Sequence, residues 1–553
     1  MSGKIIKNSK LKLPVALLLT AVILGIAYYA VFPALTPISP GFWVFIAIAV
    51  GLFVVIYTVL CLLFDKVDII SNKKSQSLII KIPFAIGVIS IIILIIGGII
   101  SAPLFRSSTY AKVMKVQDSE FEKELPETEN VSDIALMDSE SAAIIGNRAM
   151  GELTNLVSQF EVSQVYSQID YNGKPMKVAP LEYADFFKWF NNKNDGIPGY
   201  ILVDPINNTA KYIETDKAIN YSPSAYFNNS LYRHLQMKYP NKLFGNCYFE
   251  IDNEGNPFWI CSVMKHEAGL FGAENVAGCV IMDACDGTCQ YYDVEDVPTW
   301  VDIVYNGDLI QKQYNWYGNL SNGFINSVIG NKGCKVATDD YGYKVMDGDV
   351  WIYTGVTSVN GDRSNIGFIL VNSRTGECKY FNVSGAEEHS AMAAAEGEVQ
   401  NLGYDASFPS LINIAGQPTY IMVLKDNGGL VKQYALVNVS KYNVVATATT
   451  QKEVLKEYKK LLRENDLIDP QVAKNDQLFD EITVDDVQFV LVDDETIVYI
   501  RDGANNIYKQ NFSENESLIT IRQGDMIKVY YDEKSDITTI TSFEKTIDYS
   551  DIN

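Results

Sequence analysis

Three long stretches without a charged side chain lie within the first 105 residues, and no comparable stretch follows them. From Leu13 to Phe64 there is no charged residue, and a proline-bearing break from Pro33 to Pro40 divides this run into two spans. A third uncharged span runs from Ile82 to Phe105. Since a helix of about 20 apolar residues crosses a hydrocarbon core of roughly 30 Å, the sequence predicts a three-span transmembrane region, residues 1–105, followed by a large water-soluble part.

Positive charge in the short segments predicts the orientation of these spans. The break between spans one and two has no charge, whereas lysines precede the first span and lie between the second and third spans or at the entry to the third: Lys4, Lys7, Lys10, Lys12, Lys66, Lys73, Lys74 and Lys81. Because Lys and Arg are retained on the cytoplasmic side, we expect a multi-pass protein of the cell membrane with a cytoplasmic N-terminus and an extracellular C-terminal domain. A signal peptide cleaved near the small residues of Gly25–Ala30 is the alternative, and it leaves the large domain outside.

Charge is divided unevenly along the chain. Eight Lys/Arg against two Asp/Glu give residues 1–105 a net charge of +6, and because the whole chain carries −22, the remainder carries −28. This acidity argues against nucleic acid as a partner and against close contact of the domain with an anionic membrane surface. Solubility in the outer medium explains it, and a cationic peptide or divalent ions are the alternative explanation. The expected partners are the lipid bilayer and other envelope or membrane proteins.

Of the eight cysteines, Cys61 lies in the second span and seven lie beyond residue 105. Seven is an odd number, so at least one thiol is unpaired within the chain. Cys285 and Cys289 are the best candidates for a disulfide, because Asp-Gly-Thr between them predicts a tight turn. A metal site that uses Cys279, Cys285 and Cys289 is the weaker alternative, since their spacing matches no zinc signature.

A ten-residue phrase recurs three times in residues 106–448. Each copy has an apolar strand, a turn rich in Asn, Asp and Gly, and a return strand with a Tyr, which predicts antiparallel hairpins near residues 199–212, 278–291 and 367–380. The copies are VDPINNTAKY, MDACDGTCQY and VNSRTGECKY, each with a Gly four residues before: Gly199, Gly278 and Gly367. A degenerate fourth copy ends at Ala435–Tyr442. We expect Gly287 and Gly376 to supply the positive φ that such turns need.

A second phrase precedes each hairpin and predicts a further strand that is entered through a Gly/Pro turn. It begins at residues 173, 255, 347 and 416. Between these strands the sequence predicts helices over residues 139–160, 181–191, 225–238 and 386–400, and it predicts a strand over 109–116. Residues 106–448 are therefore expected to form an α+β domain.

The hairpin Gly367–Phe381, GFILVNSRTGECKYF, resembles the closing hairpin of PepSY-type modules. Val371, Thr375, Gly376 and Glu377 match the family's phrase, and Asn372 replaces its usual Asp. Residues 106–450 are also similar to uncharacterised membrane proteins of Gram-positive bacteria. The resemblance implies a location in the cell envelope, and for PepSY-type modules it implies inhibition or chaperoning of peptidases as one proposed role.

The last hundred residues change pattern. Thr450 and Glu453 form a capping box at the start of a helical linker, residues 449–472. Six short alternating segments follow between Ile482 and Phe543, and they predict a small β-barrel of the OB or SH3 kind over residues 473–553. The complete expected fold is a membrane-anchored α+β protein with PepSY-like repeats and a C-terminal barrel.

Residues able to carry chemistry are few. The chain has three histidines and contains no nucleophile elbow, phosphate loop or dinucleotide fingerprint. Glu387, Glu388 and His389 form the one candidate polar cluster, at the start of an Ala-rich helix where acidic residues also suit the helix dipole. No catalytic, cofactor-binding or metal-binding residue is assigned, and no cofactor is expected.

These observations favour a non-enzymatic protein of the cell envelope, in which a membrane-anchored binding or scaffolding module faces the outside. Two alternatives stay open. One is a hydrolase or transferase that acts on cell-wall material, supported only by location and by the cluster Glu387, Glu388 and His389. The other is a sensor or a subunit of a membrane complex, in which the three spans pack against spans of a partner.

Overall fold

A computed structural model of the chain describes residues 11–64, 73–359, 364–468, 478–492, 495–531 and 534–545. The chain divides into two compact units, one made of Met1–Ile414 with Pro418–Leu455 and the other of Ala415–Gln417 with Lys456–Asn553. Most of the loop that carries Lys66 and the Asp469-Pro470 step of the linker lie outside the described residues.

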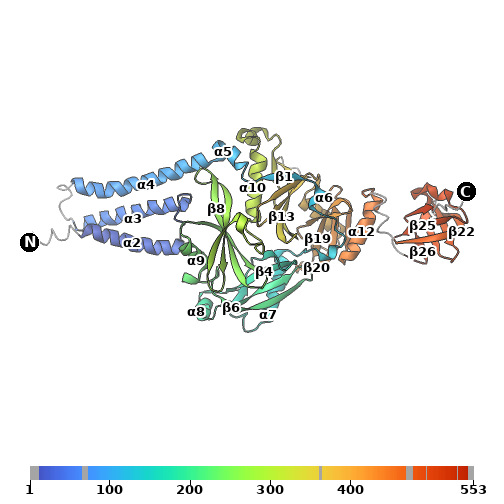
Figure 1. Ribbon diagram of the computed structural model, residues 1–553, viewed down its shortest axis with the longest axis horizontal. Coiled ribbons are helices and arrows are strands. Elements are labelled where there is room, and N and C mark those ends of the chain that lie inside the picture. Colours follow the sequence, from blue (N-terminus) through green and yellow to red (C-terminus); the bar gives the residue numbers. More distant parts are fainter. Residues whose placement is uncertain are drawn as a thin grey trace, which may run out of the picture. The chain divides into compact units, whose positions relative to one another are not determined.

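The predicted spans are helices in the first unit: α2 (Lys12–Val31), α3 (Pro40–Phe64) and α4 (Lys73–Ser101). All three contain a segment long and apolar enough to cross a membrane, with mean hydropathies of 2.2, 2.9 and 2.8 (Figure 1). This confirms the prediction of three candidate transmembrane helices. A short helix, α5 (Pro103–Tyr110), continues from α4 after Ala102.

Four antiparallel sheets follow within the first unit, and all but the second also have short accessory strands. In chain order their strands are β2 (Phe160–Val162), β3 (Ser167–Asp170), β4 (Pro175–Tyr183), β5 (Ile197–Asp204) and β6 (Thr209–Ile219); β7 (Leu243–Ile251), β8 (Pro257–Ala268), β9 (Gly272–Asp283) and β10 (Cys289–Asp293); β11 (Lys335–Ala337), β12 (Gly342–Met346), β13 (Asp349–Ser358), β14 (Ser364–Asn372), β15 (Cys378–Phe381) and β16 (Gly385–Ala386); β17 (Asp405–Ala406), β18 (Ser410–Ile414), β19 (Gln417–Lys425), β20 (Val431–Asn438) and β21 (Val445–Ala448). An N-terminal strand, β1 (Val116–Ser119), joins the third sheet in parallel with β15.

Helices accompany the sheets in the first unit. They are α6 (Phe121–Glu124), α7 (Ser139–Gly151), α8 (Phe186–Asn192), α9 (Leu231–Lys238), α10 (Gly307–Leu320), α11 (Glu388–Glu398) and α12 (Gln451–Glu464, which crosses into the second unit), with short turns η1 (Val131–Asp133), η2 (Phe227–Asn229), η3 (Val294–Asp296) and η4 (Asn326–Gly330). The bounds of the predicted elements are wrong in part: residues 181–183 belong to β4, residues 152–160 lie beyond α7, residues 225–230 precede α9, residue 386 belongs to β16, and residues 109–116 begin at the end of α5.

The three repeated phrases form the predicted hairpins β5–β6, β9–β10 and β14–β15. In each turn the side-chain oxygen of the first residue accepts two backbone N–H bonds, from residues two and three positions later: Asp204, Asp283 and Asn372. The fifth turn residue has a positive φ in all three, at Asn208, Gly287 and Gly376. The residue types that define the repeat therefore define one turn geometry.

Close packing explains the glycine that precedes each hairpin. A Cβ at Gly199, Gly278 or Gly367 would overlap a backbone carbonyl oxygen of the return strand. In each copy it would also lie within 3 Å of the Tyr of that strand, against the ring of Tyr212 or Tyr380 or the hydroxyl of Tyr291. In the second and third copies the Tyr291 and Tyr380 hydroxyls also donate to the carbonyl of the residue preceding that glycine. The Tyr ring thus covers a strand position that has no side chain of its own.

Among the described residues, three hydrophobic cores lie between the four sheets, and this explains the continuous apolar runs in the sequence. Along β9, Val280 and Met282 face the core shared with the first sheet, whereas Cys279 and Ile281 face the core shared with the third. Along β14 the same alternation sends Ile369 and Val371 to one core and Phe368 and Leu370 to the other. Because both faces of the middle sheets are buried, apolar and polar residues cannot alternate along their strands.

The second unit contains one six-stranded sheet of order β26-β24-β23-β22-β25-β27. Its strands are β22 (Leu478–Val492), β23 (Glu495–Asp502), β24 (Ile507–Asn511), β25 (Met526–Tyr531), β26 (Ile537–Thr539) and β27 (Ser542–Lys545). The first half of β22 pairs with β25 and the second half pairs with β23. This one long strand therefore belongs to both parts of the sheet, which forms a half-barrel. The predicted strand at residues 518–521 is mostly a 3-10 turn instead.

Candidate functional site

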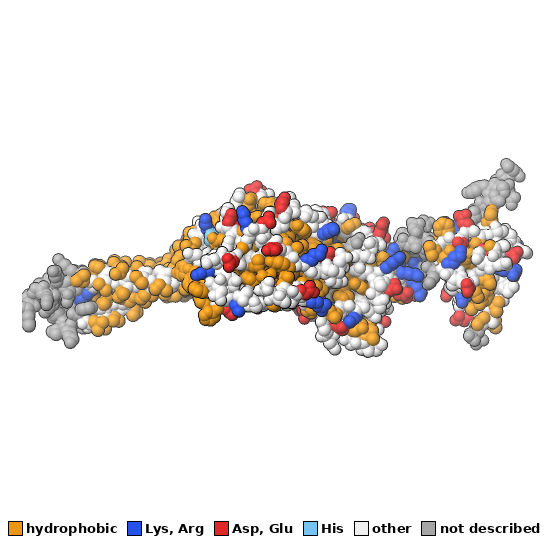
Figure 2. Space-filling model, turned by 90° about the horizontal axis from the view of Figure 1, so that it is seen from below, with side chains coloured by type: hydrophobic (Ala, Val, Ile, Leu, Met, Phe, Trp, Pro, Cys, Tyr) orange, Lys and Arg blue, Asp and Glu red, His pale blue; other side chains and the backbone are white. Residues whose placement is uncertain are grey.

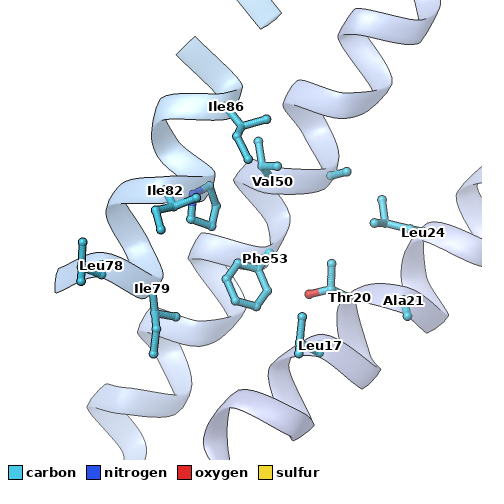
Figure 3. Close-up of a pocket in the computed structure, with 12 residues that line it drawn as sticks. Leu17, Thr20, Ala21, Leu24, Val50, Phe53, Leu78, Ile79, Ile82 and Ile86 are labelled. Carbon is cyan, nitrogen blue, oxygen red and sulfur yellow. The ribbon is translucent and has the colours of Figure 1, made fainter. Parts of the chain in front are cut away.

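The three candidate transmembrane helices form an apolar groove of about 590 Å³ (Figure 3). α2 and α4 pack along α3, so α3 forms the floor and the other two helices form the walls. The lining comes from all three helices: Leu17, Thr20, Ala21 and Leu24; Ala49, Val50 and Phe53; Leu78, Ile79, Ile82, Pro83 and Ile86. No acidic or basic side chain is among these twelve residues.

Two polar groups of this groove lack the partner that a helix normally provides. The Thr20 hydroxyl is buried and has no hydrogen-bond partner, whereas the Thr58 and Ser90 hydroxyls donate to carbonyls four residues earlier, at 2.7 and 2.9 Å. On the opposite wall Pro83 has no N–H to donate to the carbonyl of Ile79. Unsatisfied polar groups are costly in hydrocarbon, so the groove is apolar in lining but offers a hydrogen bond to an occupant at Thr20.

The predicted cluster of Glu387, Glu388 and His389 does not converge on one site. The His389 imidazole is half exposed and lies 3.3 Å from the Asp340 carboxylate. Glu387 is the N-cap residue of α11 and caps no N–H with its side chain. Glu388 points inward and is only 1% exposed. The three side chains therefore face different surroundings, which removes the geometric support for a catalytic cluster.

Glu388 lies in a buried polar layer between the third and fourth sheets. Its Oε1 accepts a hydrogen bond from the Gly355 N–H at 2.8 Å, while Oε2 has no partner. Burial raises the pKa of this carboxyl. Nearby, Asn365 donates to the Tyr420 hydroxyl, and Thr338 and Thr354 hydrogen-bond to each other. This layer is enclosed by the sheets, so it positions them rather than facing a substrate.

A second buried group of carboxylates lies where the first three sheets meet. Glu250 is fully buried, and its two oxygens accept the N–H groups of Asp302 and Ile303 at 2.8 Å each. Asp302 is 2% exposed and accepts the Asp170 N–H at 2.9 Å. Burial raises the pKa of Glu250, and burial together with the nearby Glu250 charge raises the pKa of Asp302. The next carboxylate, Asp349, is paired with Arg374 at 2.7 Å.

The candidate disulfide between Cys285 and Cys289 is not formed, and both are free thiols. The Cys285 thiol donates to the Lys217 carbonyl and the Cys289 thiol to the Gly287 carbonyl, at 3.1 and 3.3 Å. Cys285 lines a polar hollow of about 410 Å³ with Asn220 and Asp286 among its neighbours. Burial raises the pKa of Cys285 to about 12, so this thiol is not an activated nucleophile. Within the described ranges, no group of three His, Cys, Asp or Glu side chains is arranged to hold a metal ion.

We predict that oxidation joins Cys247 to Cys261 and leaves Cys285 and Cys289 unpaired. Cys247 and Cys261 are directly opposite each other on β7 and β8, and cross-strand Cα atoms of an antiparallel pair lie about 4.5–5.5 Å apart, within disulfide range. Peptide mapping of the full-length protein after mild oxidation checks this. A bridged peptide containing Cys285 and Cys289 in place of one containing Cys247 and Cys261 would contradict it.

The sequence contained a signal for one of these sites only. Thr20 is the only hydroxyl-bearing residue between Leu13 and Gly25, and a lone polar side chain within a span is a known sign of function. The carboxylates Asp170, Glu250 and Asp302 come from distant segments and share no spacing, so only the fold brings them together.

Comparison with known proteins adds no family to this geometry. No protein-family model, no curated protein and no solved structure matches the chain.

Proposed function

We propose that this protein is a non-enzymatic scaffold of the cell envelope, anchored by three transmembrane helices, which binds a transmembrane helix of another membrane protein in the groove between α2 and α4. The observation that carries the proposal is the pairing of an apolar lining with the unpartnered Thr20 hydroxyl. A lipid acyl chain fills apolar space but offers no hydrogen bond. A helix that carries a Ser, Thr, Asn or Gln side chain fills the groove and satisfies the Thr20 hydroxyl.

The location of the β domain outside the cell is part of the proposal, and the lysine distribution supports it. Reporter fusions placed after Ser75 and after Thr109 are expected to report opposite sides of the membrane, with the second outside. A cytoplasmic signal from the fusion after Thr109 would refute the extracellular location.

The resemblance to PepSY-type modules and the assignment of the second unit to OB or SH3-like barrels stay predictions. The shared turn geometry of the hairpins is compatible with the first, and the half-barrel is compatible with the second. The alternative of a cell-wall hydrolase or transferase has no supporting geometry at Glu388 and His389.

We predict that Thr20→Val weakens binding of the partner helix about threefold to eighteenfold, because an interhelical hydrogen bond in a membrane contributes roughly 0.6–1.7 kcal/mol. The measurement is photo-crosslinking in native membranes from a benzoyl-phenylalanine placed at Leu24, which lines the groove, with the yield of protein adduct compared between variants. Thr58→Val is the matched control, since that hydroxyl already donates within its own helix.

The outcomes separate three occupants of the groove. A protein adduct from position 24 that falls with Thr20→Val and not with Thr58→Val supports the proposal. An adduct between two differently tagged copies of this chain would identify the occupant as a second copy. Adducts with lipid alone, at a yield equal to that of a probe at the exposed residue Ile95, would refute the scaffold function.

A further inference from the structure

An exposed aromatic cluster lies on the first sheet module. It consists of Phe186, Phe187, Trp189 and Phe190 from α8 with Tyr226 and Phe227 from the η2 segment, and the rings of the two segments contact each other at centroid distances of 5.0 to 5.6 Å. Trp189 is buried at the base, whereas Phe187, Phe190 and Phe227 are 73, 53 and 51% exposed. A contiguous apolar patch of this kind marks an interaction surface.

The local sequence directs these rings outward. Asp185 begins α8 by accepting the N–H groups of Phe187 and Lys188, at 2.7 and 2.9 Å. Helical spacing then places Phe186 and Phe190 on one side, one turn apart, with Trp189 beside them and facing the core. Lys193 follows on the next turn, and its ammonium lies 4.1 Å from the Phe190 ring centroid.

The cluster is held beside the end of α2. The Tyr29 hydroxyl, in the last turn of α2, donates to Asn228 at 3.1 Å, and the Arg233 guanidinium lies 5.3 Å from the Tyr29 ring. Asn228 is the neighbour of Phe227 in the cluster. α8 and α9 accordingly lie at the end of the β domain that adjoins the helices (Figure 1), and hydrophobic side chains continue from the helices onto the domain (Figure 2).

A second contact joins the β domain to the helices, at the end of α4. The hydroxyl oxygen of Ser101, the last residue of α4, accepts the N–H groups of Leu270 and Phe271 at the β8–β9 turn, at 3.0 and 3.1 Å. The Phe271 ring lies against Gly97, one helical turn before the end of α4. Because the candidate span ends at Ser101 and a turn of helix rises about 5.4 Å, Phe271 lies about one helical turn inside the end of the apolar span.

We propose that the aromatic cluster inserts into the lipid interface of the leaflet in which α2 ends, so that its partner is the headgroup and upper acyl region of the bilayer. Aromatic rings concentrate at this depth because one part of the interface is apolar and the other is hydrated. In this orientation we expect the Lys193 ammonium, which lies over the Phe190 ring, to meet the lipid phosphates. The insertion depends on aromatic surface rather than on charge, so the net negative charge of the domain does not oppose it in a zwitterionic leaflet.

The test places a tryptophan at the most exposed ring of the cluster. Full-length Phe187→Trp is reconstituted in phosphatidylcholine nanodiscs with and without bromine on the upper acyl chain, and the emission of the wild-type protein, with its six native tryptophans, is subtracted. Bromine is expected to quench the added emission at least twofold. Tyr442→Trp is the matched control, because Tyr442 is an aromatic residue of similar exposure, 55%, in the turn after β20; its added emission is expected to be insensitive to bromine.

Equal quenching of Phe187→Trp and Tyr442→Trp would overturn the proposal. A blue-shifted emission at position 187 that bromine does not quench would also overturn it, because a protein surface rather than lipid would then cover the cluster. Phe190→Trp repeats the measurement at a second ring, so that the result does not rest on the folding of one variant. Loss of partner binding in the transmembrane groove leaves this quenching unchanged, so the two proposals fail separately.

Discussion

Replacing Gly278 with alanine is expected to lower the free energy of unfolding of the β domain by about 2–4 kcal/mol. Gly278 is buried in β9 between its two neighbouring strands, opposite Asp293 and Val263. A Cβ there would overlap the Tyr292 carbonyl oxygen and lie 2.9 Å from the Tyr291 hydroxyl oxygen. The first of these atoms is backbone, so the strand itself has to move. Chemical denaturation of the full-length protein in detergent, followed by tryptophan fluorescence, measures the change.

Gly397→Ala provides the control with the opposite sign. Gly397 lies in α11, is exposed, and an added Cβ there would meet no other atom within 4 Å. Alanine favours a helix over glycine by up to about 1 kcal/mol, so this variant is expected to be slightly more stable than the wild type. If both substitutions changed stability by less than about 0.5 kcal/mol, the glycine of the repeat would have no packing role and our account of the hairpins would be wrong.

The hairpins were predictable because each depends on residues close in sequence. An Asx side chain, a residue tolerant of positive φ and a Tyr four positions after that residue fix the turn and the covered glycine within about fifteen residues of chain. The core arrangement was not predictable in the same way. Runs such as FILV indicate a strand buried on both faces, but they do not say which sheets cover those faces, and the three shared cores follow from contacts between distant modules.

The errors in the predicted helices have local causes. The helix predicted over residues 181–191 begins only at Phe186, because Asp185 is the N-cap and Leu181–Tyr183 are needed as the last pairs of β4 with β2. The residues predicted to form a strand, 109–116, begin inside α5, because Pro103 in the first turn of α5 starts a second short helix after α4. In both cases a capping signal was present in the sequence and was outweighed by an apolar or alternating pattern.

The candidate sites also differ in whether the sequence reveals them. The hydroxyl of Thr20 is visible in the sequence as an isolated polar side chain in an apolar span, although the groove it faces is set by the packing of α2 and α4 on α3. Glu387, Glu388 and His389 are adjacent in sequence, but on a helix consecutive residues point about 100° apart, so adjacency did not bring them together. The buried Glu250 and Asp302 were hidden among 67 acidic residues.

The pair formed by Glu250 and Asp302 makes the stability of the β domain depend on pH. Both pKa values are raised in the folded protein by burial, and the charge of Glu250 adds to the shift of Asp302. In the unfolded chain the two carboxyls release their protons near their ordinary values, 4.5 and 3.8. Above these values the folded state holds more protons than the unfolded state, so the free energy of unfolding falls as pH rises toward the raised pKa values, by about 1.4 kcal/mol per pH unit for each extra proton.

Asp302→Asn is therefore expected to stabilise the domain at pH 8 by about 1–3 kcal/mol and to flatten the loss of stability between pH 5 and pH 8. The amide oxygen still accepts the Asp170 N–H, while the buried negative charge beside Glu250 is removed. Asp349→Asn is the control with the opposite sign, because it leaves the Arg374 side chain, 16% exposed, without its ion pair and is expected to destabilise the domain at pH 8. Denaturation curves of the three proteins at pH 5, 6, 7 and 8 measure both effects. If Asp302→Asn were less stable than the wild type at pH 8, the folded protein would stabilise Glu250 and Asp302 as ionised carboxylates. The two carboxyls would then not take up extra protons on folding.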